Sequence, residues 1–142
     1  MEQTKSTTDP RAILKKYWGY DNFRGIQLEV IETILRHEDA LVLMPTGGGK
    51  SIIYQVPTLL REGLCIVITP LIALMKDQVD RLQKVGIKAV AIHSGLSPRQ
   101  IDVALDNCAY DNRIKFLYIA PERISSEMLR QRLHKMNVSL IA

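Results

Sequence analysis

Apolar residues recur along the chain in two patterns, one typical of helices and one typical of buried strands. After Arg24, apolar residues return at helical spacing on one face, at Ile26, Val30, Ile31, Ile34 and Leu35. Short continuous apolar runs are typical of strands covered on both faces. The sequence has such runs at residues 40–44, 64–68, 89–92, 116–119 and 138–142.

The stretches between these runs carry the signals of helix ends. Asp9-Pro10 is an N-cap followed by proline at the first helical position, which predicts a short helix toward Trp18 that stops at Gly19. Ser97-Pro98 repeats that signal. Further helices are expected after Arg24, up to Glu62, around 74–85 and over 126–135. This alternation predicts a doubly wound α/β domain with a parallel sheet over residues 9–142, preceded by a polar, disordered segment at 1–8.

Composition excludes some classes of protein but does not identify one. With 142 residues, 46% of them hydrophobic and 6% aromatic, the chain suits one globular core. The net charge of +4 suits an anionic partner but also an ordinary soluble enzyme. Cys65 and Cys108 lie far apart without neighbouring Cys or His at ligand spacing, which predicts buried thiols and no zinc site. No apolar run approaches the ~20 residues of a membrane span, so we expect an intracellular protein without a membrane partner.

A glycine-rich loop follows the first apolar run and precedes a helix. It reads Met44-Pro45-Thr46-Gly47-Gly48-Gly49-Lys50-Ser51. Consecutive glycines let backbone N–H groups converge on phosphates, helped by the positive end of the helix dipole. Lys50 would add a cation, and the Ser51 hydroxyl would ligate Mg²⁺. The strict phosphate-loop pattern has glycine where this chain has Met44; the alternative is a glycine turn that caps a helix beside a solvated lysine.

A second block, upstream of the loop, suits a purine base. It reads Trp18-Gly19-Tyr20-Asp21-Asn22-Phe23-Arg24-Gly25-Ile26-Gln27. An aromatic face can stack on the base, and an amide can both donate to and accept from the adenine edge. The two blocks together predict ATP with Mg²⁺ as the ligand.

Three predicted strands end in residues that suit a sugar-phosphate backbone. Thr69-Pro70-Leu71, His93-Ser94-Gly95 and Ala120-Pro121 come directly after strands, where ligands of open parallel sheets collect. Lys76 and Arg123 would add positive charge. The residues alone equally fit prolines that break strands and solvated charges. His93 could be structural or lie near a nucleic-acid path.

Taken in order, these blocks resemble the N-terminal part of RecQ-family DNA helicases of superfamily 2. The resemblance spans roughly residue 14 to the last residue. Within that span it also rests on two longer segments, Thr69-Pro70-Leu71-Ile72-Ala73-Leu74-Met75-Lys76-Asp77-Gln78-Val79 and Tyr118-Ile119-Ala120-Pro121-Glu122-Arg123. Trp18 stands where the family usually has phenylalanine, and Thr69 where serine is common.

The resemblance implies a RecA-like, P-loop NTPase fold and assigns roles to individual residues. It implies that Tyr20, Arg24 and Gln27 contact the adenine and that residues 46–51 contact the phosphates. It also implies that Ser51 ligates Mg²⁺ and that Lys50 is the catalytic residue. The implied contacts to single-stranded or partly duplex DNA come from Thr69, Pro70, Leu71, Lys76, Ser94, Gly95, Ala120, Pro121 and Arg123. The implied activity is an ATP-dependent helicase of 3′-to-5′ polarity, in the cytoplasm, on the nucleoid or in the nucleus.

The family's Asp-Glu-Ala-His box and second motor domain are not in the sequence, so we expect residues 9–142 to form an incomplete first motor domain with little turnover of its own. The alternatives are a nucleotide-gated DNA-binding module without turnover, an RNA helicase, and a small-molecule phosphotransferase. The last would need an arginine-rich lid, which we do not recognise.

Overall fold

The computed structural model describes residues 9–45 and 49–142, and the chain divides into two compact units. Unit 1 spans Met1–Arg61 and unit 2 spans Glu62–Ala142. The predicted disorder of residues 1–8 lies outside the described residues. Within the described ranges, no helix combines the length and the apolar character that crossing a bilayer requires.

In its described residues, unit 1 is helical. Its elements are α1 (Pro10–Trp18), α2 (Gln27–Leu35) and α3 (Ile52–Leu59). They pack around Ile13, Ile31 and Val56, of which Ile31 and Val56 have no exposed surface. The predicted ends of α1 are confirmed, because the Asp9 side chain caps its first turn and Gly19 ends it with a left-handed φ of 77°.

The prediction of a strand over residues 40–44 is wrong in this structure. These residues form neither helix nor strand, and the side chains of Leu41 and Leu43 are 95% and 89% exposed. A strand requires a neighbouring strand to satisfy its backbone N–H and C=O groups. The described part of unit 1 holds only helices, so it offers this apolar run no partner.

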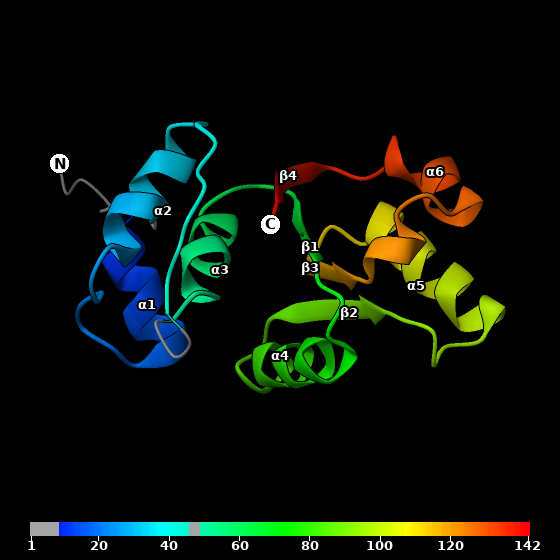
Figure 1. The fold of residues 1–142 in the computed structure, drawn as a ribbon, viewed down its shortest axis with the longest axis horizontal. Helices are drawn as coiled ribbons and strands as arrows, with labels where there is room; N and C mark the ends of the chain where they lie inside the picture. Colours follow the sequence, from blue (N-terminus) through cyan, green and yellow to red (C-terminus); the bar gives the residue numbers. More distant parts are fainter. Residues whose placement is uncertain (1–8, 46–48) are drawn as a thin grey trace, which may run out of the picture. The chain divides into compact units, whose positions relative to one another are not determined.

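Unit 2 is an α/β layer structure built on a parallel sheet (Figure 1). Its elements are β1 (Leu64–Ile68), α4 (Ile72–Lys84), β2 (Lys88–Ile92), α5 (Pro98–Tyr110), β3 (Ile114–Ile119), the 3₁₀ turn η1 (Pro121–Arg123), α6 (Glu127–Leu133) and β4 (Val138–Ile141). The strand order is β2-β3-β1-β4, and every pairing is parallel. This arrangement confirms the α/β fold with a doubly wound parallel sheet, consistent with a RecA-like domain.

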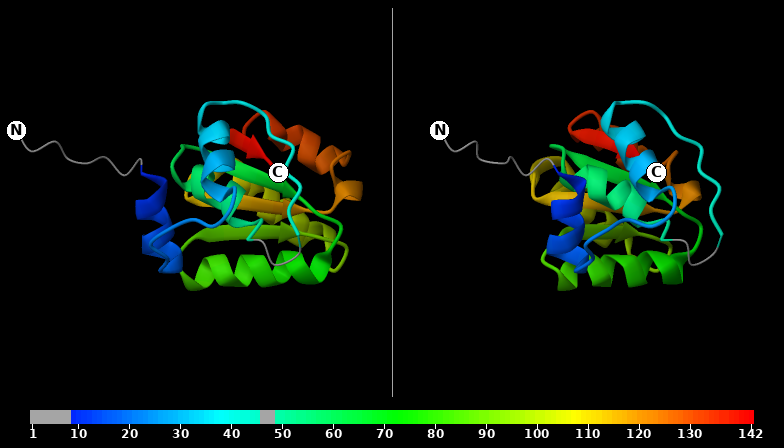
Figure 2. Two further views of the ribbon diagram at one scale, coloured as in Figure 1. Left: turned by 60° about the vertical axis from the view of Figure 1, so that its left-hand side comes forward. Right: turned by 90° about the vertical axis from the view of Figure 1, so that its left-hand side faces the viewer.

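Helices cover both faces of this sheet, as consecutive residues of β3 show. Tyr118 points toward α4, where its hydroxyl donates a 2.7 Å hydrogen bond to Oε1 of Gln78. Leu117 and Ile119 belong to the apolar cluster that α5 and α6 contribute to on the opposite face. Successive side chains of a strand point to opposite faces, so α4 lies on one side and α5 with α6 on the other. Figure 2 shows α4 running along β2.

Local signals define the ends of the helices in unit 2. Ser97 and Gln100 form a capping box at the start of α5, in which each side chain accepts a hydrogen bond from the other residue's backbone N–H.

On the next helix, α6, the Arg132 side chain donates to Asp106 (Nε to Oδ1, 2.6 Å) and to Asp102, both on α5. These ion pairs join the two helices that cover the same face.

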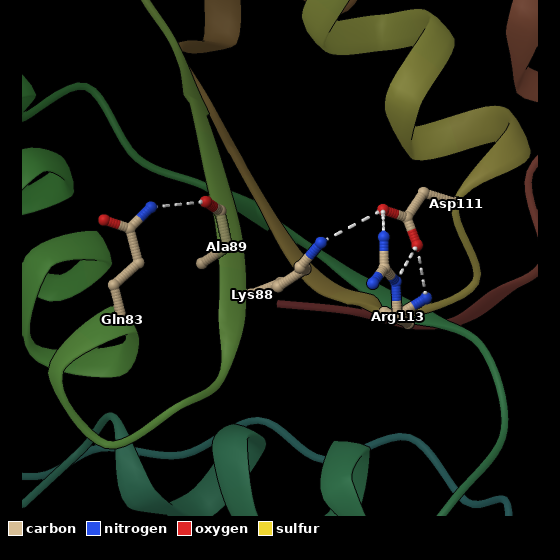
Figure 3. A network of polar contacts seen from close by, with 5 residues as sticks. All are labelled: Gln83, Lys88, Ala89, Asp111 and Arg113. Carbon is tan, nitrogen blue, oxygen red and sulfur yellow. Dashed lines mark hydrogen bonds and ion pairs between the residues drawn. The ribbon is translucent and has the colours of Figure 1, made fainter.

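A polar network lies at the amino ends of β2 and β3 (Figure 3). The carboxylate of Asp111, just after α5, accepts from Arg113 Nε (3.0 Å) and from Lys88 Nζ at the start of β2 (3.4 Å). On the other side of β2, Gln83 Nε2 donates to the carbonyl of Ala89 (3.2 Å). The network therefore ties the turn after α5 to β2, and β2 to α4.

Acid should weaken this network, because hydrogen bonds from the Arg113 side chain and backbone, with Lys88, hold the pKa of Asp111 well below its usual range. A depressed folded-state pKa contributes stability above the unfolded-state pKa, about 3.9, and loses it as pH falls toward the folded-state value. We expect Asp111→Asn to show a shallower loss of stability than wild type between about pH 5 and pH 2 in denaturant titrations. Asp80→Asn, an exposed position on α4, is the matched control. If Asp111→Asn lost stability as steeply as wild type over this pH range, the role of this network would be contradicted.

Candidate functional site

In unit 1 the segment predicted to read adenine is hydrogen-bonded to the end of the glycine-rich loop. The backbone N–H of Arg24 donates to Oε1 of Gln27 (2.8 Å), and the N–H of Gln27 donates to the Arg24 carbonyl (3.1 Å). The other half of the Gln27 amide, Nε2, donates to the carbonyl of Gly49 (3.1 Å). Gln27 is only 2% exposed, so this side chain connects α2 to the residue before Lys50.

Two independent features favour glycine at position 49. Its φ of 74° lies in the left-handed region, which residues with a Cβ adopt at a cost. A Cβ there would also lie 2.3 Å from Nε2 of Gln27 and 3.7 Å from a terminal nitrogen of Arg24. The loop backbone and the segment predicted to read adenine are therefore in close contact, which neither block reveals by itself.

The other residues of unit 1 that are predicted to bind the nucleotide differ in exposure. Lys50 is exposed, and Tyr20 is 60% exposed in the turn after α1. Ser51 immediately precedes α3, and its hydroxyl makes no capping hydrogen bond to the described backbone of that helix. A cation and a hydroxyl at a helix N-terminus suit an anion with a bound Mg²⁺. Thr46, Gly47 and Gly48 lie outside the described residues.

In unit 2 the predicted DNA-contacting residues gather at the carboxyl edge of the sheet. Because β3 lies between β2 and β1, the turns that follow these three strands are neighbours. Hydrogen bonds join the first residue of one turn to the last residue of the neighbouring strand: the N–H of Ala120 donates to the Ile92 carbonyl (3.3 Å), and the N–H of Thr69 donates to the Ile119 carbonyl (3.1 Å). Three segments far apart in sequence thus form one edge.

The candidate side chains at this edge are not equally available. Pro70, Leu71, Lys76, Ser94, Gly95 and Pro121 are exposed, and Thr69 and Arg123 are partly exposed. Ala120 is only 1% exposed, so its methyl group packs inside rather than facing a ligand. The Thr69 hydroxyl accepts from the N–H of Leu71 (3.3 Å), which shapes the turn between β1 and α4. The edge therefore presents small polar groups, backbone and two cations.

Two side chains beside this edge make contacts that the sequence did not predict. Oε1 of Gln78 accepts a hydrogen bond from the Tyr118 hydroxyl, and the helical spacing of Gln78 from the buried Met75, Val79 and Leu82 was the available signal. His93 is only 6% exposed, and its Nδ1 accepts the backbone N–H of Gly95 (3.0 Å).

Comparison with known proteins identifies the family. The family model of the DEAD/DEAH box helicases matches residues 24–142. The chain is 44% identical over 127 residues to the ATP-dependent DNA helicase RecQ of Synechocystis, covering 89% of this chain and 26% of that protein. It is 44% identical over 133 residues to the RecQ helicase of Bacillus subtilis, covering 93% of this chain and 22% of that protein.

A third relative, the RecQ helicase of Haemophilus influenzae, is 43% identical over 131 residues, which cover 92% of this chain and 21% of that protein. The chain thus spans about a quarter of the length of the curated relatives that it matches. The family model covers most of the sequence, including the turn at Arg24, the residues that flank the glycine-rich loop and the whole sheet of unit 2. The chain therefore belongs to the DEAD/DEAH box helicase family.

Proposed function

We propose that the chain supplies the nucleotide-binding part of the first motor domain of an ATP-dependent DNA helicase that resembles RecQ. The observation that carries the proposal is the Gln27 amide, hydrogen-bonded to the Arg24 backbone and to the Gly49 carbonyl. This contact holds the segment suited to adenine against the end of the loop suited to phosphates. An ATP site requires both parts within the length of one nucleotide.

The residues of unit 1 fit Mg²⁺-ATP by the chemistry of their donors. Lys50 would neutralise phosphate charge, and the Ser51 hydroxyl would ligate Mg²⁺. Tyr20 has an exposed ring for stacking on the base, and Arg24 would contact the adenine. Gln27 would contact the adenine by exchanging its hydrogen bond to the Gly49 carbonyl for one to the base. Thr46, Gly47, Gly48 and Gly49 would offer backbone N–H groups. The bound nucleotide supplies the phosphoanhydride whose hydrolysis drives the motor.

The carboxyl edge of the unit 2 sheet suits a nucleic-acid backbone. Ser94, Gly95 and Thr69 offer small polar groups, and Lys76 and Arg123 offer positive charge. We propose that this edge contacts single-stranded DNA, with Pro70, Leu71, Ala120 and Pro121 shaping the turns. In the intact protein a second motor domain would close on the nucleotide, and translocation would run 3′ to 5′, as the resemblance to RecQ helicases implies.

Two binding measurements on the 142-residue chain test this proposal. We expect a fluorescent ATP analogue to bind in the presence of Mg²⁺ and to be displaced by ATP. We expect a fluorescein-labelled oligothymidylate to bind with an affinity that falls as salt rises, because phosphate contacts release counterions. Absence of nucleotide binding would contradict the ATP site, and absence of salt-sensitive oligonucleotide binding would contradict the DNA edge.

The contact between Gly49 and Gln27 makes a sharper prediction. Gly49→Ala should weaken binding of the ATP analogue about tenfold, because it adds a Cβ at 2.3 Å from Nε2 of Gln27 and strains a positive φ. Gly19→Ala is a matched control: its φ of 77° carries the same strain, but its Cβ would meet nothing within 4 Å. Equal losses of affinity in the two variants would show that the contact with Gln27 is irrelevant to nucleotide binding.

A further inference from the structure

His93 ends β2 as a buried polar side chain whose ring is engaged with its own turn. It is 6% exposed, whereas the other two histidines, His37 and His134, are exposed. Its Nδ1 accepts the N–H of Gly95 (3.0 Å), so this nitrogen carries no proton and Nε2 does. Burial, with the positive charge of Lys76 on α4, lowers the pKa of His93 and favours this neutral form.

The ring and the turn are fitted to each other. A Cβ at position 95 would lie 2.9 Å from Cε1 of His93, closer than real Cβ contacts come, and 3.0 Å from Nδ1, so the ring or the turn would have to shift. The His93 carbonyl also accepts from the N–H of Leu96 (3.2 Å). One residue therefore closes the turn through its side chain and its backbone, and the turn leads directly into the capping box of α5 at Ser97.

The turn that His93 holds presents Ser94 and Gly95 to solvent at the carboxyl edge of the sheet. Hydrogen bonding of Ala120 to Ile92 keeps the end of β3 beside the same turn. A serine hydroxyl and backbone N–H groups contact phosphates only when the turn presents them in a fixed direction. A loosened turn would have to be ordered again at each binding event, at a cost in affinity.

We infer that His93 is a positioning residue whose buried ring holds the Ser94–Gly95 turn in the form that contacts the DNA backbone. The inference rests on the proposed DNA-binding edge and assigns a role to a residue that the sequence left open between a structural position and a nucleic-acid path. It also explains the glycine at position 95: φ there is not in the left-handed region, and a Cβ would require the His93 ring or the turn to shift.

The chemistry of the contact suggests a conservative replacement. A side chain that accepts from the N–H two residues later adopts the arrangement of an Asx turn. The Oδ1 atom of asparagine can therefore replace Nδ1 of His93, whereas alanine removes the acceptor. His93→Asn should retain the turn, and His93→Ala should lose it.

The experiment measures oligothymidylate binding by fluorescence anisotropy and exchange of the Gly95 amide hydrogen by NMR, on the 142-residue chain. We expect His93→Ala to weaken DNA binding about fivefold, the effect of losing one hydrogen bond, and to speed exchange at Gly95. His93→Asn should restore both to within about twofold of wild type. His134→Ala, an exposed histidine after α6, should change neither.

A double-mutant comparison separates the turn from general damage. Gly95→Ala should reduce DNA affinity with His93 present and reduce it less in the His93→Ala background, because the clashing ring is gone. Additive losses would count against the inference.

The remaining outcomes separate the inference from the proposed function. Wild-type DNA affinity in His93→Ala, with faster exchange at Gly95, would overturn the inference and leave the proposed DNA edge in place. Unchanged exchange in His93→Ala would overturn it as well. If the wild-type chain itself binds no oligothymidylate, the proposed DNA edge fails, and the inference fails with it.

Discussion

Lys50→Ala is expected to weaken binding of Mg²⁺-ATP by about 30-fold or more, because it removes a cation from phosphates that carry several negative charges. Lys50 lies between Gly49, which contacts Gln27, and Ser51, which precedes α3. Its side chain is exposed, so the substitution should leave the melting temperature of the chain nearly unchanged. Titration with a fluorescent ATP analogue, followed by displacement with ATP, measures the effect.

Lys84→Ala is the matched control for this substitution. Lys84 is an exposed lysine in the last turn of α4, and its loss changes the net charge by the same amount. We expect it to bind the nucleotide as wild type does. Equal affinities of Lys50→Ala and wild type would mean that the glycine-rich segment does not bind phosphates, and the proposed ATP site would be wrong.

The second large effect is on stability: Phe116→Ala should lower the free energy of unfolding by about 3–5 kcal/mol. Phe116 has no exposed surface and lies in β3, with β2 on one side and β1 on the other. Removing its ring leaves a cavity in the middle of the sheet face that α4 covers. A thermal melt followed by circular dichroism should show a midpoint lower by about 10 °C or more.

Two further variants show whether this loss comes from the cavity. Phe116→Leu should lose less stability, because leucine fills more of the space. Tyr110→Ala removes an aromatic ring that is 68% exposed and contacts Lys135 (Nζ to hydroxyl, 3.0 Å), so we expect about 1 kcal/mol or less. A loss for Tyr110→Ala as large as that for Phe116→Ala would contradict the position of Phe116 in the core.

Local chemistry made most of the helices and strands predictable. Asp9, Gly19 and Ser97 define helix ends through hydrogen bonds or a φ value that depend on residues nearby in sequence. The apolar runs at 64–68 and 116–119 became buried strands. The same pattern misled us at residues 40–44, because an apolar run becomes a strand only beside another strand.

The candidate sites were predictable as blocks but not as contacts. The sequence placed Gln27 in an adenine-reading segment and Gly49 in a phosphate loop, yet no local signal links residues this far apart. The same holds for Gln78 with Tyr118, whose pairing depends on α4 lying against β3. For His93, its place after an apolar run left open whether it is structural or lies near a nucleic-acid path.

The sequence by itself determined the elements of this protein, the family that it resembles and the residue types suited to ATP and DNA. Those properties follow from periodicity, capping residues and motif spacing, which act over a few neighbouring residues. Only the tertiary structure decided that β3 lies between β2 and β1, which brings the turns at Thr69, Ser94 and Pro121 to one edge. It also decided that the His93 ring and Gly95 fit each other, because strand order and side-chain packing arise from contacts that the linear sequence does not record.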